Sequence, residues 1–309
     1  MRFALCAMFF AIGSLFFIPE TPAETKLPTY SDSITNDEDE GNLSYPNLVL
    51  IEPVRNEIYV IDSQNRFIIY TSDFFPLVTV GKKHGIEAPQ GLTVDAEGNI
   101  YVAMGVSQNF RKPRVAVLNA SLKLVRNIFL EGFANDNLFV PYHLAIDKTG
   151  NIYVAGFHFP GVLVFDNSGS LVEIMVPEES GIPVRINNVT IDNGGRIYLV
   201  SEEEGHIYVY DEKKTFLFQF GEKGGSSGKL SRPQAAGIDN RNGNIYIVDF
   251  MRHTINVYDA KGKYLYEFGG QGWSEGWFQY PRAISIDSAG RILVADTANN
   301  RIQVLKTAE

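Results

Sequence analysis

The sequence contains a single cysteine, Cys6, which lies near its start. A disulfide bond needs two cysteines, so the chain has no internal disulfide and its core has to supply the stability. Of its 309 residues, 45% are apolar and 20% are charged, which is the composition of a globular protein with ample material for a large core.

The sequence also lacks an excess of positive charge. It has 27 lysine and arginine residues against 36 aspartate and glutamate residues, giving a net charge of −9. A protein that binds nucleic acid presents a basic face to the phosphate backbone, so this balance argues against nucleic acid as a partner.

Long apolar runs are rare, and the longest is Phe3 to Ile18, 16 residues. Arg2 precedes the run, and the small residues around Ala23 follow it. A run this short suits a secretory signal better than a membrane span, which needs about 20 apolar residues. We therefore predict a signal peptide over residues 1–23, with an uncleaved anchor as the alternative. The mature protein is expected to be extracytoplasmic, periplasmic or secreted, without a stable membrane span.

Residues 24–41 form an acidic segment with six carboxylates and one lysine, and its second half is expected to be a solvated linker. Asp37, Asp39 and Gly41 do not make a calcium-binding EF-hand loop, because the glycine comes at the fifth position and not at the sixth.

The most informative feature of the sequence is a repeat. Six units share a short apolar run, an acidic residue, a tight turn and an alternating apolar run. The acidic residues of the six units are Glu52, Asp95, Asp147, Asp192, Asp239 and Asp287. Their separations of 43, 52, 45, 47 and 48 residues are typical of propeller blades.

The turns and strands of each unit agree with this interpretation. Five units carry glycine at the turn, at Gly98, Gly150, Gly195, Gly243 and Gly290, and the first carries Asn56. Glycine and asparagine tolerate a positive φ angle, so we expect a left-handed residue at this point. Four strands in each of six units predict an all-β, six-bladed propeller of antiparallel blades over residues 42–309.

The last unit ends after a third strand, Arg301–Leu305, and so lacks its outer strand. An unpaired edge would weaken the ring. The segment from Thr25 to Ile34 is the available donor, and we predict that it closes the last blade. The alternative is closure by side-chain packing alone.

The units resemble the NHL repeat family. The motif is clearest in ISIDSAGRILVADTANNRIQVL, Ile284 to Leu305, and in the fifth unit, which contains AAGIDNRNGNIYIVD. The resemblance implies a six-bladed propeller of the exported bacterial type. It does not fix a function, because this fold carries ligases, lyases, sensors and scaffolds.

A ring of polar residues is predicted at the mouth of the central channel. These residues follow the proline that begins the first strand of each blade, or Ile186 in blade 4. They are Asn47, Gln90, Tyr142, Asn187, Gln234 and Arg282. Four amides with an arginine and a tyrosine suit an anionic or hydrogen-bonding ligand, such as a carboxylate, a peptide terminus or a sugar. The alternative is that they bind channel water.

No metal site or other cofactor is predicted. Lyases that resemble this family hold zinc with histidines at the mouth position, and calcium-dependent lactonase-like propellers use carboxylates there. This ring contains neither. His143 lies one residue further along, where strand alternation should turn it away from the channel, so it remains a weak alternative ligand, together with His158.

A second candidate surface lies on the loops that surround the channel mouth. Aromatic and arginine residues, which are enriched in protein interfaces, occur there. They are Phe110, Arg111, Phe157, Phe159, Trp273 and Trp277. The alternative is that these rings only fill gaps between blades.

We therefore expect an exported, non-catalytic propeller, a scaffold or sensor, that binds a protein, peptide or glycan through its loop face and channel mouth. The alternative is a metal-dependent lyase or a lactonase-type hydrolase with its site at the channel.

Overall fold

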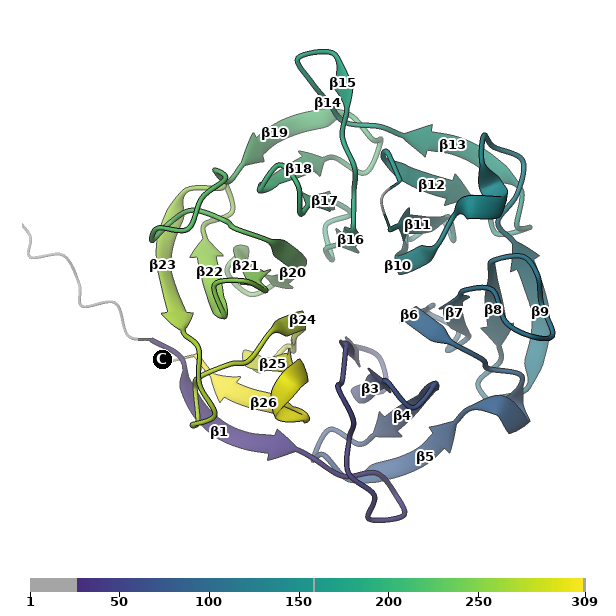
Figure 1. Cartoon of the computed structure of the whole chain (residues 1–309), viewed down its shortest axis with the longest axis horizontal. Helices are drawn as coiled ribbons and strands as arrows, with labels where there is room; N and C mark the ends of the chain where they lie inside the picture. The colour runs from purple at the N-terminus through teal and green to yellow at the C-terminus, as the bar shows by residue number, and fades with distance from the viewer. Residues whose placement is uncertain (1–26, 158, 308–309) are drawn as a thin grey trace, which may run out of the picture.

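The computed structural model describes residues 27–157 and 159–307 as six four-stranded antiparallel sheets around a central axis (Figure 1). This confirms the predicted all-β, six-bladed propeller. The signal peptide predicted over residues 1–23, with Cys6, lies outside the described residues.

Each blade runs from an innermost to an outermost strand. Blade 1 contains β2 (Leu48–Glu52), β3 (Glu57–Asp62), β4 (Arg66–Tyr70) and β5 (Pro76–Val80), and blade 2 contains β6 (Pro89–Val94), β7 (Ile100–Met104), β8 (Arg114–Leu118) and β9 (Leu124–Phe129). Blade 3 contains β10 (Pro141–Ile146), β11 (Ile152–Gly156), β12 (Val162–Phe165) and β13 (Leu171–Met175), and blade 4 contains β16 (Asn188–Ile191), β17 (Ile197–Ser201), β18 (His206–Tyr210) and β19 (Phe216–Phe220). Blade 5 contains β20 (Pro233–Asp239), β21 (Asn244–Asp249), β22 (Thr254–Tyr258) and β23 (Tyr264–Gly269), and blade 6 contains β24 (Pro281–Ile286), β25 (Arg291–Asp296), β26 (Arg301–Lys306) and β1 (Thr29–Ile34).

The N-terminal strand closes the ring, as predicted. β1 pairs antiparallel with β26, from Thr29 opposite Lys306 to Ile34 opposite Ile302. Ile34 is buried in the apolar layer between blades 6 and 1. The last blade therefore gains its outer strand from the other end of the described chain, and no edge of β26 is left unpaired.

The second half of the acidic segment differs from the expected solvated linker at one residue. Asp37 is buried, accepts hydrogen bonds from the backbone N–H groups of Asp39 and Gly41, and pairs with Arg66 at 2.5 Å. Burial opposes ionisation, but Arg66 and the two backbone donors hold the pKa of Asp37 below its usual range. A counter-ion from blade 1, which sequence alone does not reveal, draws this residue inward.

The apolar core is divided into six layers, one between each pair of neighbouring blades. Each layer takes side chains from two adjacent sheets, as with Val154 of blade 3, which packs in the layer shared with blade 2. Alternating strand residues face opposite sides of a sheet, so each blade contributes to two layers.

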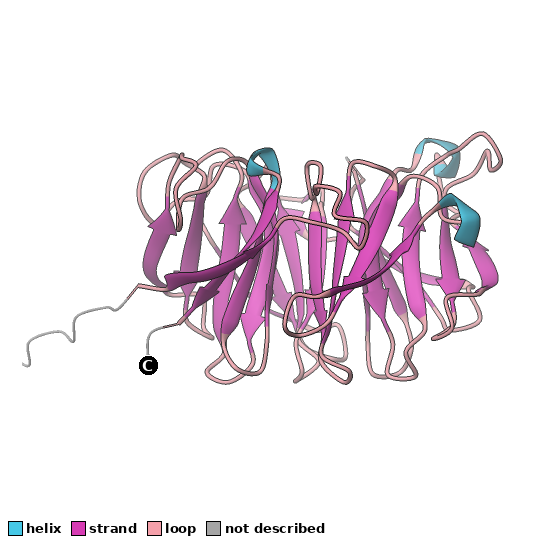
Figure 2. Ribbon diagram, turned by 90° about the horizontal axis from the view of Figure 1, so that it is seen from below, coloured by secondary structure: helices cyan, strands magenta, loops and turns pink. Residues whose placement is uncertain are grey.

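The two ends of the ring have different structures (Figure 2). At one end, which we call the turn end, the repeated acidic residues sit in tight turns whose glycines have φ between 79° and 88° and whose Asn56 has φ of 58°. This confirms the predicted left-handed position. The other end, the loop face, carries longer loops and three short 3-10 helices, η1 (Lys82–His84), η2 (Asp136–Leu138) and η3 (Thr297–Asn299).

The sequence analysis predicted neither the 3-10 helices nor one further pair of strands. A two-stranded hairpin, β14 (Glu178–Glu179) and β15 (Ile182–Pro183), lies between blades 3 and 4 and extends beyond the ring (Figure 1). Among the described residues, no helix is long and apolar enough to cross a membrane.

Candidate functional site

The first strands of four blades contain a bulge beside the residue that follows the initial proline. The register shifts between Pro89 and Gly91, between Pro141 and His143, between Pro233 and Ala235, and between Pro281 and Ile284. A bulge re-aims the side chain that it contains. Gln90, Tyr142, Gln234 and Arg282 all lie within these irregular stretches, at the loop face.

Two of these residues meet across the channel mouth. Arg282 of blade 6 donates a hydrogen bond from Nη1 to the hydroxyl of Tyr142, at 3.2 Å, although blade 3 lies opposite blade 6 in the ring (Figure 1). The guanidinium also lies 4.9 Å from the ring centre of Phe250, within cation–π range. The pair spans the mouth and divides it into two halves.

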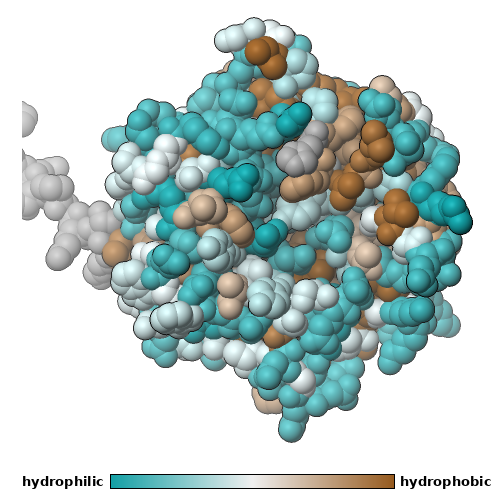
Figure 3. Space-filling view, in the orientation of Figure 1, coloured by the Kyte–Doolittle hydropathy of each residue, from teal (hydrophilic) through white to brown (hydrophobic). Residues whose placement is uncertain are grey.

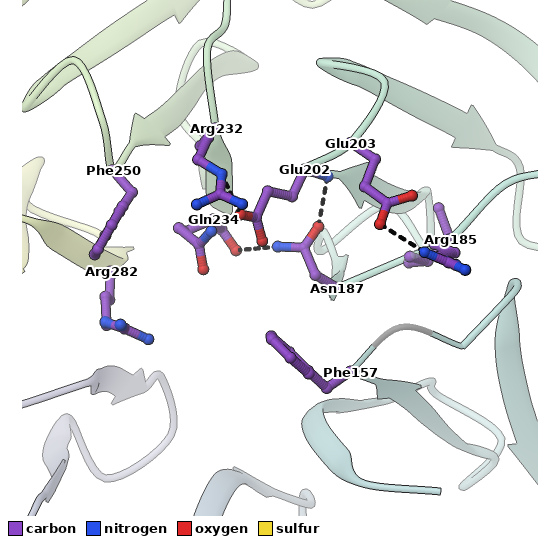
Figure 4. Close-up of a pocket in the computed structure, with 10 residues that line it drawn as sticks. Phe157, Arg185, Asn187, Glu202, Glu203, Arg232, Gln234, Phe250 and Arg282 are labelled. Atoms are coloured by element: carbon purple, nitrogen blue, oxygen red, sulfur yellow. Dashed lines mark hydrogen bonds and ion pairs between the residues drawn. The ribbon is translucent and has the colours of Figure 1, made fainter.

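A pocket of about 240 Å³ lies on one side of this bridge (Figure 4). It is built mainly from blades 4 and 5, with Arg282 from blade 6 and Phe157 from blade 3. Its lining consists of Phe157, Arg185, Ile186, Asn187, Glu202, Glu203, Arg232, Gln234, Phe250 and Arg282. Three of the six predicted mouth residues, Asn187, Gln234 and Arg282, therefore share one cavity.

The charges of the pocket are paired except at one point. Arg185 pairs with Glu203 at 2.9 Å, and Arg232 pairs with Glu202 at 2.8 Å. Arg282 has no carboxylate within ion-pair distance among residues 27–157 and 159–307. The pocket thus carries one uncompensated positive charge, next to an aromatic ring.

The amide of Asn187 is held rigidly. Its nitrogen donates to the carbonyl oxygens of Pro233 and Gln234 at 3.3 and 3.2 Å, and its oxygen accepts from the N–H of Glu202 at 2.8 Å. Asn187 therefore joins blades 4 and 5, and its hydrogen-bonding groups are already used. The side chain of Gln234 lines the same cavity (Figure 4) and is the amide still available to a ligand.

Asn47 and Gln90 lie in the other half of the mouth and do not line the pocket. Gln90 donates to the carbonyl oxygen of Ala88 at 3.4 Å. The side-chain oxygen of Asn47 is buried without a hydrogen-bond partner. The predicted ring is thus divided, with its ligand-sized cavity on the side of blades 4 to 6.

His143 is buried, and its ring makes an edge contact with that of Tyr142, with the two ring centres 4.4 Å apart. Burial and then the nearby Arg282 charge lower its pKa to about 4, so the imidazole is neutral near pH 7. No group of three or more histidine, cysteine or carboxylate side chains that could hold a metal occurs in the described parts of the chain. The alternative partner ligand His158 lies outside them.

The predicted loop-face residues separate into two kinds. Trp273, Trp277, Phe157 and Arg111 are exposed. Phe159 instead packs edge-on against Phe133 and Phe139, with ring centres 5.5 and 5.1 Å apart, so its ring fills a gap between loops. Phe110 is half-buried and covers the guanidinium of Arg114, which lies 3.6 Å from its ring centre. Figure 3 shows a largely hydrophilic face on which apolar residues are scattered.

Several pocket residues were missed by the sequence analysis, namely Arg185, Glu202, Glu203, Arg232 and Phe250. A repeat signal for some of them was present. Phe157, Glu202 and Phe250 each follow the last residue of the second strand in blades 3, 4 and 5. The loops after second strands share the loop face with the mouth residues, so comparison of this position across units would have found them.

Two family models match parts of the chain. Residues 178–270 match the family described as "6-bladed beta-propeller", and residues 278–305 match the NHL repeat. The second match includes the whole stretch from Ile284 to Leu305 that carries the resemblance to the NHL repeat, and the first includes the fifth-unit stretch. No curated protein matches the sequence.

Solved structures with the same fold include a protein of unknown function from Bacteroides thetaiotaomicron VPI-5482, with a TM-score of 0.68 and 16% identity over 91% of this chain and 76% of that one. An auxiliary nutrient binding protein from the same organism has a TM-score of 0.68 and 15% identity over 92% and 76% of the two chains. A streptogramin B lyase has a TM-score of 0.60 and 12% identity over 93% and 100%. At these identities the likeness shows the fold alone.

Proposed function

We propose that this six-bladed β-propeller, which carries an NHL repeat near its C-terminal end, is an extracytoplasmic binding protein and not an enzyme. Its pocket at the channel mouth holds the carboxylate-bearing end of a soluble ligand. The observation that carries the proposal is Arg282, a guanidinium without a carboxylate partner in a cavity whose other arginines are paired. Arginine binds carboxylates through parallel N–H donors, and a ligand carboxylate would supply the missing counter-charge.

The size of the pocket limits what it holds. About 240 Å³ is below the range of about 300–1,000 Å³ for whole drug-sized ligands. It fits one ring or one side chain with its carboxylate, so the rest of the ligand extends over the loop face. The C-terminal residue of a peptide and the uronic acid end of a glycan both have this chemistry. Phe157 and Phe250 would contact the ring or side chain, and Gln234 would hydrogen bond to it.

The comparisons are compatible with this proposal. One solved structure of the same fold is described as an auxiliary nutrient binding protein, which suggests a binding role and an extracytoplasmic location. Another solved structure of the same fold is a lyase, and the alternative for this chain is a lyase or hydrolase reaction at the channel that uses a metal. The pocket's acidic residues, Glu202 and Glu203, are both paired with arginines. A cation would have to compete with these pairs.

Calorimetric titration with two sets of probes tests the proposal. Short peptides with free or amidated C-termini form one set, and galacturonic acid oligomers or their methyl esters form the other. We expect one free-acid set to bind, and Arg282→Met to weaken that binding by at least about tenfold, because it removes a charge-assisted hydrogen bond. Arg196→Met, an exposed arginine at the turn end, is the control and should bind as the unaltered chain does.

Two results would contradict the proposal. One is equal binding of acid and amide or ester forms, since Arg282 would then not read a carboxylate. The other is about one tightly held zinc or calcium ion per purified chain together with turnover of the bound compound, which would favour the enzyme. Cell fractionation tests the predicted location.

A further inference from the structure

A fully buried arginine in blade 2 has no role in the pocket described above. Arg114 begins β8 and is 0% exposed. Its Nε donates to the side-chain oxygen of Asn127 at 3.1 Å, and its Nη2 contacts the sulfur of Met104 at 3.9 Å. Its Nη1 has no hydrogen-bond partner. A buried cation without an ion pair and with an unpaired N–H donor is destabilising, so this arrangement needs an explanation.

The repeat itself shows what is missing. In blade 1, Arg66 begins the third strand and stands opposite Asp62 at the end of the second, and the two form an ion pair at 3.1 Å. In blade 6, Arg301 stands opposite Asp296 and pairs with it at 2.8 Å. In blade 2 the residue opposite Arg114 is Met104. Blade 2 therefore has the arginine of blades 1 and 6 without the aspartate opposite it.

The Met104 sulfur also lies where the aspartates of blades 1 and 6 accept a hydrogen bond from the backbone. Asp62 and Asp296 also accept an N–H from the segment that leads into their blade, from Ser44 at 3.3 Å and from Gln279 at 2.6 Å. In blade 2 the N–H of Glu87 points at the sulfur of Met104 at 3.4 Å, and a thioether sulfur is a weak acceptor. The position is therefore the same structural site with its carboxylate removed.

A groove lies beside this site and shares Glu87 with it. Its volume is about 600 Å³, and it runs between blades 1 and 2 on the loop face. Glu87, whose N–H meets Met104, lines it, as do Ser107 and Gln108 of the loop between β7 and β8. Lys82 and Lys83 line it too, and neither forms an ion pair with a described residue. The hydroxyl of Thr79, also in the lining, is buried without a partner.

The ring of Phe110 covers the guanidinium of Arg114. Phe110 belongs to the same loop as Ser107, and the Arg114 guanidinium lies 3.6 Å from its ring centre. Cation–π contact compensates part of the lost hydration but supplies no acceptor for Nη1. The loop is held on the groove side by a hydrogen bond from Asn109 to the Glu87 carboxylate at 2.6 Å. Displacement of Phe110 would uncover the guanidinium.

We propose that Arg114 is the anchor of a second binding site, which takes an oxyanion group of a ligand lying in the groove between blades 1 and 2. The oxyanion accepts from Nη1 of Arg114 and, after displacing the Met104 sulfur, from the N–H of Glu87. Asp62 and Asp296 accept in the same way from the arginine and the backbone N–H of their own blades. Phe110 covers the site when it is empty. The carboxylate of a sugar acid and the sulfate of a sulfated sugar share this chemistry. No residue of this site lines the channel-mouth pocket, so the proposal does not depend on that one.

Three variants test the second site, with radiolabelled sulfate and acetate as probes in equilibrium dialysis at constant ionic strength set with chloride. Phe110→Ala should bind at least one probe about tenfold more tightly than the unaltered chain, because the Phe110 ring no longer covers the guanidinium and competes with the probe. Met104→Asp should abolish this binding, because it restores the carboxylate found in blades 1 and 6. Met104→Asp should also melt at a temperature no lower than the unaltered chain does. Arg196→Met, an exposed arginine at the turn end, is the control and should bind normally.

The relative binding of acetate and sulfate identifies the chemical class of the oxyanion, and two other results would overturn the proposal. Preference for acetate indicates a carboxylate ligand, and preference for sulfate indicates a sulfate ester. Absence of saturable binding by Phe110→Ala overturns the proposal, and so does unchanged binding by Met104→Asp. If Met104→Asp does not fold, the double variant Phe110→Ala, Arg114→Met replaces it, and retention of binding there has the same meaning.

Discussion

The two ends of the propeller treat their charged groups in opposite ways. At the turn end the acidic residue of each repeat accepts several hydrogen bonds from its own turn, and a tyrosine of the next strand adds another in blades 2, 3 and 4. At the loop face the repeat is broken at single positions, and Arg282, Arg114 and Asn47 are left with unmatched charge or hydrogen-bonding groups. We infer that the turn end supplies stability and the loop face supplies recognition.

The largest expected effect is at the turn end. Asp147 accepts from the N–H groups of Thr149 and Asn151, from the side chains of both, and from Tyr153. Burial opposes its ionisation, but these donors hold the pKa of Asp147 below its usual range. Asp147→Ala should lower the free energy of unfolding by about 3 kcal/mol, because charge-assisted hydrogen bonds are lost and donors are left unpaired.

Urea denaturation measures this effect. Arg282→Met is the matched variant at the loop face, and it should unfold within about 0.5 kcal/mol of the unaltered chain. If both variants lose the same amount, the division between the two ends is wrong.

The second-largest expected effect on stability depends on pH and comes from His143 at the loop face. His143 has a pKa of about 4 in the folded chain and about 6.5 when unfolded. The unfolded chain therefore binds the proton first, so stability is complete above pH 6.5 and is lost as the pH falls towards 4. At about pH 5 His143 should lower the free energy of unfolding by about 2 kcal/mol relative to its value at about pH 8. The charged group that faces it is Arg282, and Tyr142 lies against its ring.

His143→Leu isolates this contribution from that of the carboxylates, since only the histidine differs. The difference in stability between the two chains should change in favour of His143→Leu as the pH falls. A pH-independent difference would mean that His143 titrates normally and is not shielded from solvent.

The sequence predicted most of the fold and only part of the site, for a physical reason. Period, turn glycines and alternation are local signals that recur six times, so the blade count, the left-handed turns and the closing strand could all be inferred. The pocket depends on which side chains from different blades meet across the channel. The contact between Tyr142 and Arg282 joins residues 140 positions apart, and no repeat signal encodes it.

The exceptions within the repeat were visible but were not compared. Met104 occupies the place of Asp62, Asp249 and Asp296, and that single difference leaves Arg114 without its partner. The role of Arg114 follows only once the register of the second and third strands is known, because sequence alone does not show that positions 104 and 114 lie opposite each other.

A smaller effect is expected at a turn glycine. Gly150 has φ of 85°, and an added Cβ would meet Asn167 at 3.4 Å, which is ordinary contact. Gly150→Ala should therefore cost only the conformational penalty of a left-handed alanine, about 1 kcal/mol, measured by urea denaturation. Gly150→Asn should cost less, as Asn56 fills the same place in blade 1. A loss above about 3 kcal/mol would mean that the turn is crowded as well as left-handed.

The smallest effect on stability is expected at Trp273, although it is among the largest side chains of the loop face. It is 77% exposed, and its loop is held through the backbone, because Arg301 donates to the carbonyl oxygens of Trp273 and Ser274 at 2.9 and 3.1 Å. Trp273→Ala should change the free energy of unfolding by less than about 0.5 kcal/mol. Trp277 is the matched control, since its ring lies over Gly270 and Gly272, and its replacement by alanine should lower the free energy of unfolding by more.

If the loop face binds a partner, Trp273→Ala should reduce capture of that partner from an envelope extract while the melting temperature stays unchanged. A fall in both partner capture and melting temperature would mean that Trp273 stabilises the fold. The contrast between the two ends would then not extend to this loop.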